Sequence, residues 1–455
     1  FDYMPHGFVS EEDDWAATEL KLRTARRDAA TQVFGSSGPD GLIALAARAP
    51  VPGLVGDVAG ELVLLSPNEE AALLQTCLGH ADGARANLAR GYAIGRHRSA
   101  EEWPEAVLSD QAMAWTPQQQ AAFLLCLPPC AETWDRAESF GEETHRRYWE
   151  AARPYPLGTA GDCARAARAL VSGGRTSAAI ELLGLMSGKK AETEPPPELV
   201  REVLEAFARA PGPAPLSSMI AYYTRRLLDG LVSCDAEAES HAAALEWRLL
   251  PLLEDQGGPR YLHRELQRNP QFFGLLISLF WPAEDAPALE RSADERLLAE
   301  RAFRVLQGWR LLPGLSDSGE DASEVLAAWV LAAREVVASE NRGGMGDNYI
   351  GRILACGPHG ADGHFPHPAV RQIIEEADSR EIEAGFCLAI FNSRGVFTKD
   401  PCAGGDQERD LAKRYREHAD AVAAEWPRTA ATLRVMEKRY LDWADREDAQ
   451  GTLRH

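Results

Sequence analysis

The length, composition and net charge of this 455-residue chain limit what it can be. A chain of this length exceeds what one hydrophobic core usually fills, which predicts two or three domains or one elongated array. The formal net charge of −21 opposes direct binding to a nucleic-acid backbone, because such binding needs a basic surface. The eight cysteines form no CxxC pair, and no apolar run reaches the roughly 18 residues that span a bilayer. Since the start of the chain also lacks a signal-peptide pattern, we predict a cytoplasmic protein that engages neither membrane nor nucleic acid.

Helix patterns dominate the first part of the chain. Apolar residues recur at helical spacing from Glu11 to Phe34, and Asn68 is expected to cap a helix with two acids in its first turn. The segment Ala84–His97 should form a hairpin with that helix. Thr116-Pro117 should open another helix, because proline suits the first helical position. The best strand candidate is the short segment Glu61–Leu65.

The clearest helix hairpin of the first half spans Asp162–Met186. Two alanine-rich segments flank Gly173-Gly174, a local pattern typical of tetratricopeptide (TPR) or HEAT units. Breaks recur throughout the chain without a strict period. We therefore predict an all-α fold, an irregular TPR/HEAT-like solenoid of stacked helix hairpins. The proline-rich linker at 189–197 predicts a boundary between an N-terminal array, residues 1–190, and a C-terminal array, residues 198–455.

Aromatic residues gather in the third quarter of the chain, before two long helices predicted at 293–312 and 321–340. The stretch Asn269–Trp281 could line a groove for a peptide or a partner helix, although aromatic residues at helical spacing more often form core. One cluster between successive helices is expected to contain Trp247, Tyr261, Phe272, Phe273, Phe280 and Trp281.

One loop, residues 356–368, collects side chains that can bind a metal ion. Its candidates are His359, Asp362, His364 and His367. Imidazole and carboxylate groups are common ligands of transition metals. The interpretation that we favour is a polar connector between two helices, because metal ligands are normally held on more rigid elements.

Two glycine-rich stretches, 339–352 and 403–408, raise the question of phosphate binding. The first lacks the preceding strand and the Lys-Ser/Thr pair of a phosphate-binding loop, so it is predicted to be a helix–helix turn. The second is interpreted in the same way, with Asp406 as an N-cap. No motif in the chain nominates a catalytic residue or a cofactor-binding residue.

The last predicted hairpin, Asp406–Asp448, should dock on the helices before it. Its inward-facing candidates recur at helical spacing and are Leu411, Tyr415, Ala419, Val422, Leu433, Tyr440 and Trp443. An undocked hairpin could not offset the entropy of ordering its backbone, about 1–2 kcal/mol per residue. If the Trp443 ring is fully buried, Trp443→Ala should cost about 3–5 kcal/mol.

Three stretches together carry a family resemblance: Leu245–Trp281, Ile350–Glu375 and Asn392–Asp448. They resemble the C-terminal helical region of large, poorly characterised bacterial multidomain proteins of the type associated with antiphage defence, over residues 245–448. The resemblance implies a helical tail behind an N-terminal ATPase or other effector domain. It supplies no catalytic residues.

The functional prediction is a non-enzymatic helical-repeat module that senses or binds a protein, such as an effector subunit, an oligomer mate or a phage protein. Because the first residue is Phe1, we expect a fragment of a longer protein, with any catalysis in an upstream domain or a partner. No cofactor is predicted. Two alternatives stay open: a metal-dependent all-α enzyme that uses the loop 356–368, and a purely structural module that assembles an upstream ATPase.

Overall fold

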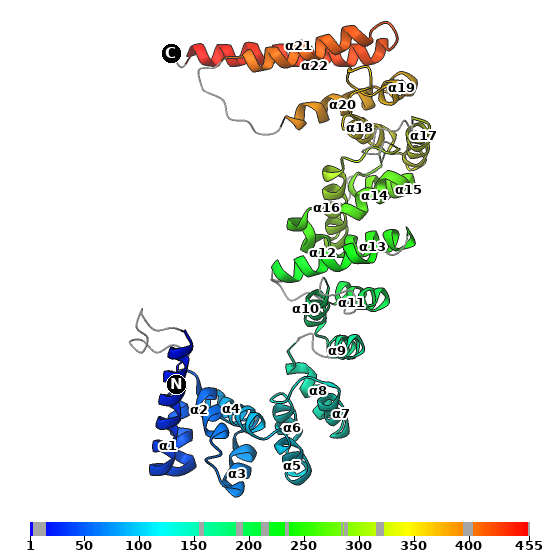
Figure 1. Ribbon diagram of the computed structural model, residues 1–455. Helices are drawn as coiled ribbons and strands as arrows, with labels where there is room; N and C mark the ends of the chain where they lie inside the picture. Colours follow the sequence, from blue (N-terminus) through cyan, green and yellow to red (C-terminus); the bar gives the residue numbers. More distant parts are fainter. Residues whose placement is uncertain are drawn as a thin grey trace. The chain divides into compact units, whose positions relative to one another are not determined.

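The computed structural model describes an all-α protein. It describes residues 1–2, 15–153, 159–187, 194–210, 218–232, 236–283, 285, 290–314, 323–394 and 404–453. Over these ranges the chain forms 22 α-helices and short 3-10 turns, and no strand (Figure 1). The all-α prediction is confirmed.

The chain divides into two compact units, which we call the N-terminal unit (Phe1–Leu227) and the C-terminal unit (Leu228–His455). The division falls inside α12 (Ser218–Val232). The domain boundary predicted at 189–197 stays a prediction, and residues 188–193 lie outside the described residues.

The N-terminal unit is built from one long helix and a series of shorter ones. They are α1 (Trp15–Arg48), α2 (Pro52–Glu61), α3 (Pro67–Cys77), α4 (Gly83–Ser99), α5 (Trp103–Asp110), η1 (Ala112–Ala114), α6 (Pro117–Leu124), α7 (Ala131–Ser139), α8 (Glu142–Ala151), α9 (Ala160–Ser172), α10 (Thr176–Met186), α11 (Pro197–Arg209) and most of α12. Helices α9 and α10 confirm the predicted hairpin, and α11 packs on both. The predicted first helix extends beyond Phe34 to Arg48 with a break at Gly38, while residues 3–14 lie outside the described part.

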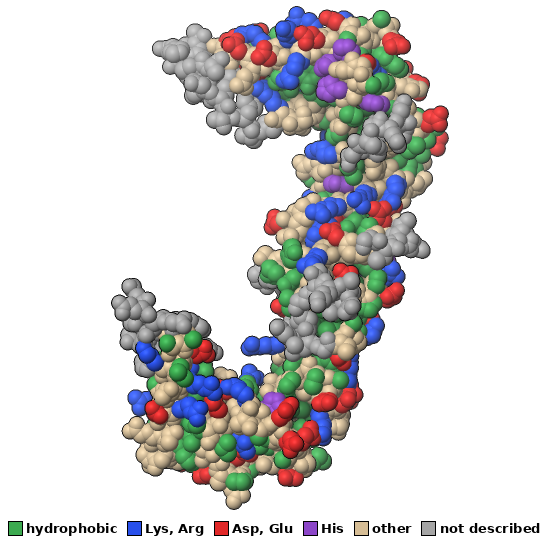
Figure 2. All heavy atoms as spheres, viewed as in Figure 1, with side chains coloured by type: hydrophobic (Ala, Val, Ile, Leu, Met, Phe, Trp, Pro, Cys, Tyr) green, Lys and Arg blue, Asp and Glu red, His purple; other side chains and the backbone are tan. Residues whose placement is uncertain are grey.

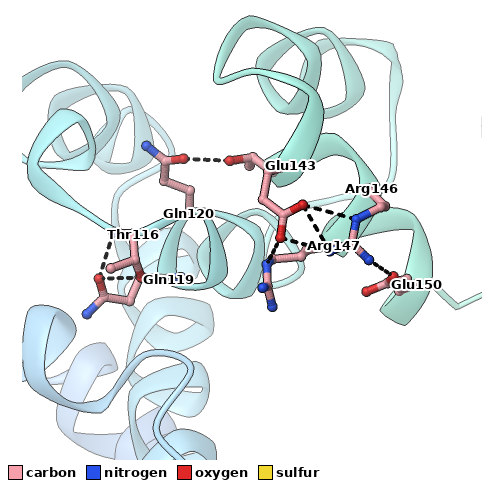
Figure 3. A network of polar contacts seen from close by, with 8 residues as sticks. Thr116, Gln119, Gln120, Glu143, Arg146, Arg147 and Glu150 are labelled. Atoms are coloured by element: carbon pink, nitrogen blue, oxygen red, sulfur yellow. Dashed lines mark hydrogen bonds and ion pairs between the residues drawn. The ribbon is translucent and has the colours of Figure 1, made fainter.

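Capping chemistry explains where several of these helices begin. Helix α6 begins at Thr116-Pro117, as predicted, and Thr116 caps it. Its hydroxyl accepts a hydrogen bond from the Gln119 amide, and the Gln119 side chain accepts one from the Thr116 amide (Figure 3). The predicted Asn68 cap is wrong. Ser66 caps α3 instead, because Pro67, which has no N–H to satisfy, takes the first helical position.

The strand predicted at Glu61–Leu65 is also wrong. Glu61 is the last residue of α2, and Val63 adopts a left-handed backbone conformation with φ of 52°. A β-branched residue in that conformation belongs to a turn, because it cannot continue an extended strand.

Glycines bring α2 and α4 into backbone contact. A Cβ atom at Gly56 would lie 2.0 Å from the Leu88 carbonyl oxygen, and one at Gly91 would lie 2.0 Å from the Gly53 carbonyl oxygen. Only residues without a side chain permit such an approach. Helix α4 therefore packs mainly on α2, and its contact with α3, the predicted hairpin partner, is smaller.

The C-terminal unit contains the remaining helices. They are α13 (Ala236–Leu253), η3 (Glu254–Gln256), α14 (Arg260–Arg268), α15 (Pro270–Phe280), α16 (Ala293–Gly308), α17 (Ser323–Ser339), α18 (Gly343–Leu354), α19 (Pro368–Ala377), α20 (Arg380–Ser393), α21 (Asp406–Val422) and α22 (Pro427–Leu453). Helix α15 packs on α16 and α17, α17 on α18, and α18 on α20. The two long helices predicted at 293–312 and 321–340 correspond to α16 and α17.

Two carboxylates cap the first turn of a helix other than their own. Glu246 of α13 is 0% exposed and accepts hydrogen bonds of 2.8–3.0 Å from the amides of residues 260–262 at the start of α14. Glu375 of α19 accepts in the same way from the amides of residues 428–429 at the start of α22. These amides have no acceptor within their own helix, so each carboxylate joins two helices by satisfying them.

The C-terminal hairpin docks on the unit, as predicted. Helices α21 and α22 run side by side (Figure 1), and α22 packs on α19 and α20. Inside the hairpin the rings of Tyr415 and Tyr440 are stacked, with centroids 5.7 Å apart. A buried ion pair of 2.8 Å joins Arg394 at the end of α20 to Glu408 of α21.

The premise of the Trp443→Ala prediction is not met, because the Trp443 side chain is only half-buried and its indole N–H donates to Glu447. We now expect this variant to lose less than about 3 kcal/mol of unfolding free energy. Tyr440→Ala should lose about 3–5 kcal/mol, because that ring is 1% exposed. Urea unfolding of both variants measures the difference, and a larger loss for Trp443→Ala would contradict the packing described here.

Candidate functional site

The structure gives structural roles to two of the four metal-ligand candidates. Asp362 pairs with Arg371 of α19 at 2.6 Å and accepts a hydrogen bond from the His364 amide. The hydrogen-bonded Arg371 guanidinium holds the pKa of the Asp362 carboxyl far below its ordinary value. His367 caps α19, with its Nδ1 atom accepting from the Ala369 amide at 3.2 Å. Both side chains thus fold the loop against α19, as a polar connector would.

The other two candidates lie beside a histidine from a distant helix. The rings of His359 and His364 lie 5.4 and 5.9 Å from that of His418 on α21, measured between centroids. Figure 2 shows histidine side chains gathered on this part of the surface. Burial, reinforced by the two neighbouring imidazoles, lowers the pKa of His418. The sequence analysis missed His418 because it lies alone in the α21 pattern, far along the chain from the loop.

This histidine cluster is not arranged as a metal centre. Within the described ranges, no three His, Cys, Asp or Glu side chains are placed to hold one metal ion. The Nδ1 atom of His418 instead accepts a hydrogen bond of 3.4 Å from the amide of Phe365. The metal-dependent enzyme hypothesis therefore gains no geometric support from the loop 356–368.

Both glycine-rich stretches begin helices, as predicted. At the start of α18, a Cβ atom on Gly346 would lie 2.4 Å from the Val337 side chain, and Asp347 pairs with Arg334 of α17 at 2.9 Å. The first turn of α18 therefore packs against α17, which leaves no room for a phosphate. At the start of α21 the N-cap is Gly405, and Asp406, predicted to be the cap, is the first helical residue.

A groove of about 960 Å³ in the C-terminal unit is the best candidate for a binding surface. We call it the α14–α17 groove. Arg264 and Arg268 of α14 line one side. Leu311 and three outward-facing residues of α17, Glu324, Val325 and Ala328, line the other side, which is apolar except for the Glu324 carboxylate.

The floor of the α14–α17 groove is Trp329, which packs on an aromatic cluster behind it. The Trp329 indole N–H donates to the Leu266 carbonyl at 3.1 Å, which fixes the ring between α14 and α17. Phe273 lies 5.3 Å from Trp329 and 6.1 Å from Trp309, measured between ring centroids. The predicted single aromatic cluster is therefore wrong in its membership, because Phe280 belongs to a second group with Trp281 and Phe303.

The two sides of the groove differ in charge and polarity. Arg264 and Arg268 are 52% and 49% exposed, whereas Glu239, the carboxylate that both contact, is 15% exposed. The α14 side thus presents guanidinium groups to solvent. Val325 is 54% exposed, and Leu331, which lies six residues further along α17 and outside the groove lining, is 63% exposed.

Comparisons with known proteins supply no further assignment. No protein-family model, no curated protein and no solved structure matches this chain. Across the helices that the structure describes, none has both the length and the apolar composition needed to cross a bilayer.

Proposed function

We propose that the chain is a non-enzymatic helical interaction module, and that the α14–α17 groove binds an amphipathic helix of a partner protein. The observation that carries this proposal is the exposed apolar strip of α17 beside the groove. Val325 and Ala328 of this strip line the groove, and Leu331 continues the strip beyond it, each residue three positions after the one before. Burying a side chain such as valine or leucine contributes about 1.5–3 kcal/mol, so a partner that covers the strip gains affinity directly.

The partner is a helix because the groove is bounded by helices and has an apolar side at helical spacing. An amphipathic helix places apolar residues at i, i+3, i+4 and i+7, which matches such a groove. Along the edge that meets α14, this helix carries Asp or Glu. Half-exposed guanidinium groups form charge-assisted hydrogen bonds with carboxylates, and arginine suits that geometry.

The wider setting that we propose for this module rests on sequence patterns. Stacked helix pairs, arranged as an irregular TPR/HEAT-like array, would extend the groove into a longer surface. The antiphage-defence setting, with an effector subunit or a phage protein as partner, rests on the resemblance described above and belongs to the proposal.

A display library of helical peptides tests the proposal. Full-length protein should enrich amphipathic peptides with acidic edges. Val325→Asp should weaken binding of the selected peptides by about tenfold or more, because it places a charge against the apolar face of the peptide. Val435→Asp is the matched control, since Val435 is 57% exposed on α22 of the same unit.

Three outcomes would overturn the proposal. The first is a library without enrichment. The second is enriched peptides that tolerate Val325→Asp as well as Val435→Asp. The third is an oligomer of the wild-type chain that Val325→Asp dissociates, because the groove would then bind a second copy.

A further inference from the structure

The N-terminal unit contains a cavity of about 420 Å³ that none of the sequence motifs indicated. It lies among the turns and helices from α6 to α10, with Arg90 of α4 at one edge. Its volume falls within the range of about 300–1,000 Å³ that is typical of small-molecule sites.

Aromatic and aliphatic side chains line much of the cavity. The Trp149 ring lies 5.6 Å from Trp134 and 5.3 Å from Tyr148, measured between centroids. The Trp149 indole N–H donates to His145 at 3.0 Å, which fixes the ring. Leu170 of α9 also lines the cavity. Aromatic faces of this kind suit a ring-shaped ligand.

Contacts made by other residues of α8 hold this wall in place (Figure 3). The Thr144 hydroxyl donates to Gln120 of α6 at 2.6 Å, and Gln120 in turn donates to the Ala112 carbonyl at 2.9 Å. The α8 carboxylates Glu143 and Glu150 are engaged by arginines of the same helix, outside the cavity. Neither carboxylate therefore lines the cavity.

The charge around the cavity is positive. Arg90 and Arg153 line it, both are exposed, and Arg90 also lies beside the Cys126 thiol. No Asp or Glu occurs among the described lining residues. Arg175 adds a third guanidinium close by, donating to the carbonyls of Trp149 and Ala152 at 2.7 and 2.5 Å. An arginine stays charged in this setting, so the cavity favours an anion.

We propose that this cavity binds a small organic anion with a flat aromatic body. The ring lies against Trp134 and Trp149, and the anionic group faces Arg90 and Arg153. Carboxylates and phosphates share the required chemistry, because the guanidinium fork hydrogen-bonds to either group. This site is independent of the α14–α17 groove, so either proposal can fail without the other.

Calorimetric titration of the full chain tests the site with two anions, 1-naphthoate and adenosine monophosphate. Their neutral counterparts, 1-naphthalenemethanol and adenosine, test the need for charge, and inorganic phosphate tests the need for a ring. At least one aromatic anion should bind about tenfold more tightly than its neutral counterpart and than phosphate, because it combines stacking with a charge-assisted contact. If only naphthoate binds, the cavity prefers a carboxylate as the anionic group of its ligand. If only the nucleotide binds, it prefers a phosphate.

Variants connect the binding to these residues. Arg90→Gln and Arg153→Gln should each weaken binding of the anion by about tenfold. Arg90→Lys, which keeps the charge, should weaken binding less. Arg201→Gln on α11 is the control, because Arg201 is also exposed and lies outside the cavity. The proposal is overturned if neither anion binds at millimolar concentration, if the neutral compounds bind equally well, or if Arg201→Gln weakens binding as much as the cavity variants.

Discussion

Gly385→Ala is expected to destabilise the C-terminal unit by at least about 3 kcal/mol, whereas Gly230→Ala should stabilise it by about 0.5–1 kcal/mol. A Cβ atom on Gly385 of α20 would lie 1.9 Å from the carbonyl oxygen of Asn348 on α18. That oxygen belongs to the backbone and cannot rotate away, so the two helices must separate. At Gly230, a Cβ atom meets nothing within 4 Å, so alanine only reduces the entropy of the unfolded chain.

Hydrogen exchange of the peptides that cover α18 and α20 is the appropriate measurement, because the two units need not unfold in a single transition. The Gly385→Ala variant should lose protection there, and the Gly230→Ala variant should keep it. Unchanged protection in Gly385→Ala would mean that α18 and α20 are not in backbone contact.

Glu246→Ala should lower the free energy of unfolding by about 2–6 kcal/mol, because it leaves three amides at the start of α14 without an acceptor, two of which are buried. Each unsatisfied buried donor costs about 1–3 kcal/mol. Glu246→Gln should cost less, since its amide oxygen still accepts hydrogen bonds. Chemical denaturation, combined with exchange rates of the amides 260–262, measures the effect.

The control for Glu246 is Glu335→Ala on α17, because Glu335 is exposed and belongs to the same unit. This surface substitution should change the free energy of unfolding by no more than about 0.5 kcal/mol. Similar losses at Glu246 and Glu335 would show that the carboxylate of Glu246 does not support α14.

The sequence predicts the helices of this protein well because their signals are local. Thr116-Pro117 begins a helix by its own chemistry, and the hairpins at 162–186 and 406–448 have apolar residues at helical spacing. The role of the buried helix glycines is not predictable in the same way. Gly56, Gly91 and Gly385 lie inside helices, where glycine lowers helix propensity, and their purpose depends on a partner backbone that the sequence does not identify.

The candidate sites could be predicted only in part, because tertiary packing creates them. The aromatic stretch 269–281 was linked to a possible groove, and its Phe273 does support the floor of the α14–α17 groove. The groove itself requires α14 and α17 to lie side by side, and no local sequence pattern predicts that contact. The cavity beside Trp149 likewise draws residues from several helices, including Arg90 of α4.

The carboxylate of Glu375 has a consequence for the order in which the C-terminal unit folds. It caps amides more than 50 residues later in the chain, at the start of α22. The first turn of α22 is therefore stabilised only after α19 has formed, and a loop of that length must close beforehand. A contact of such long range makes the docking of the last hairpin on α19 a late event in folding, although the two helices of the hairpin are neighbours in the sequence.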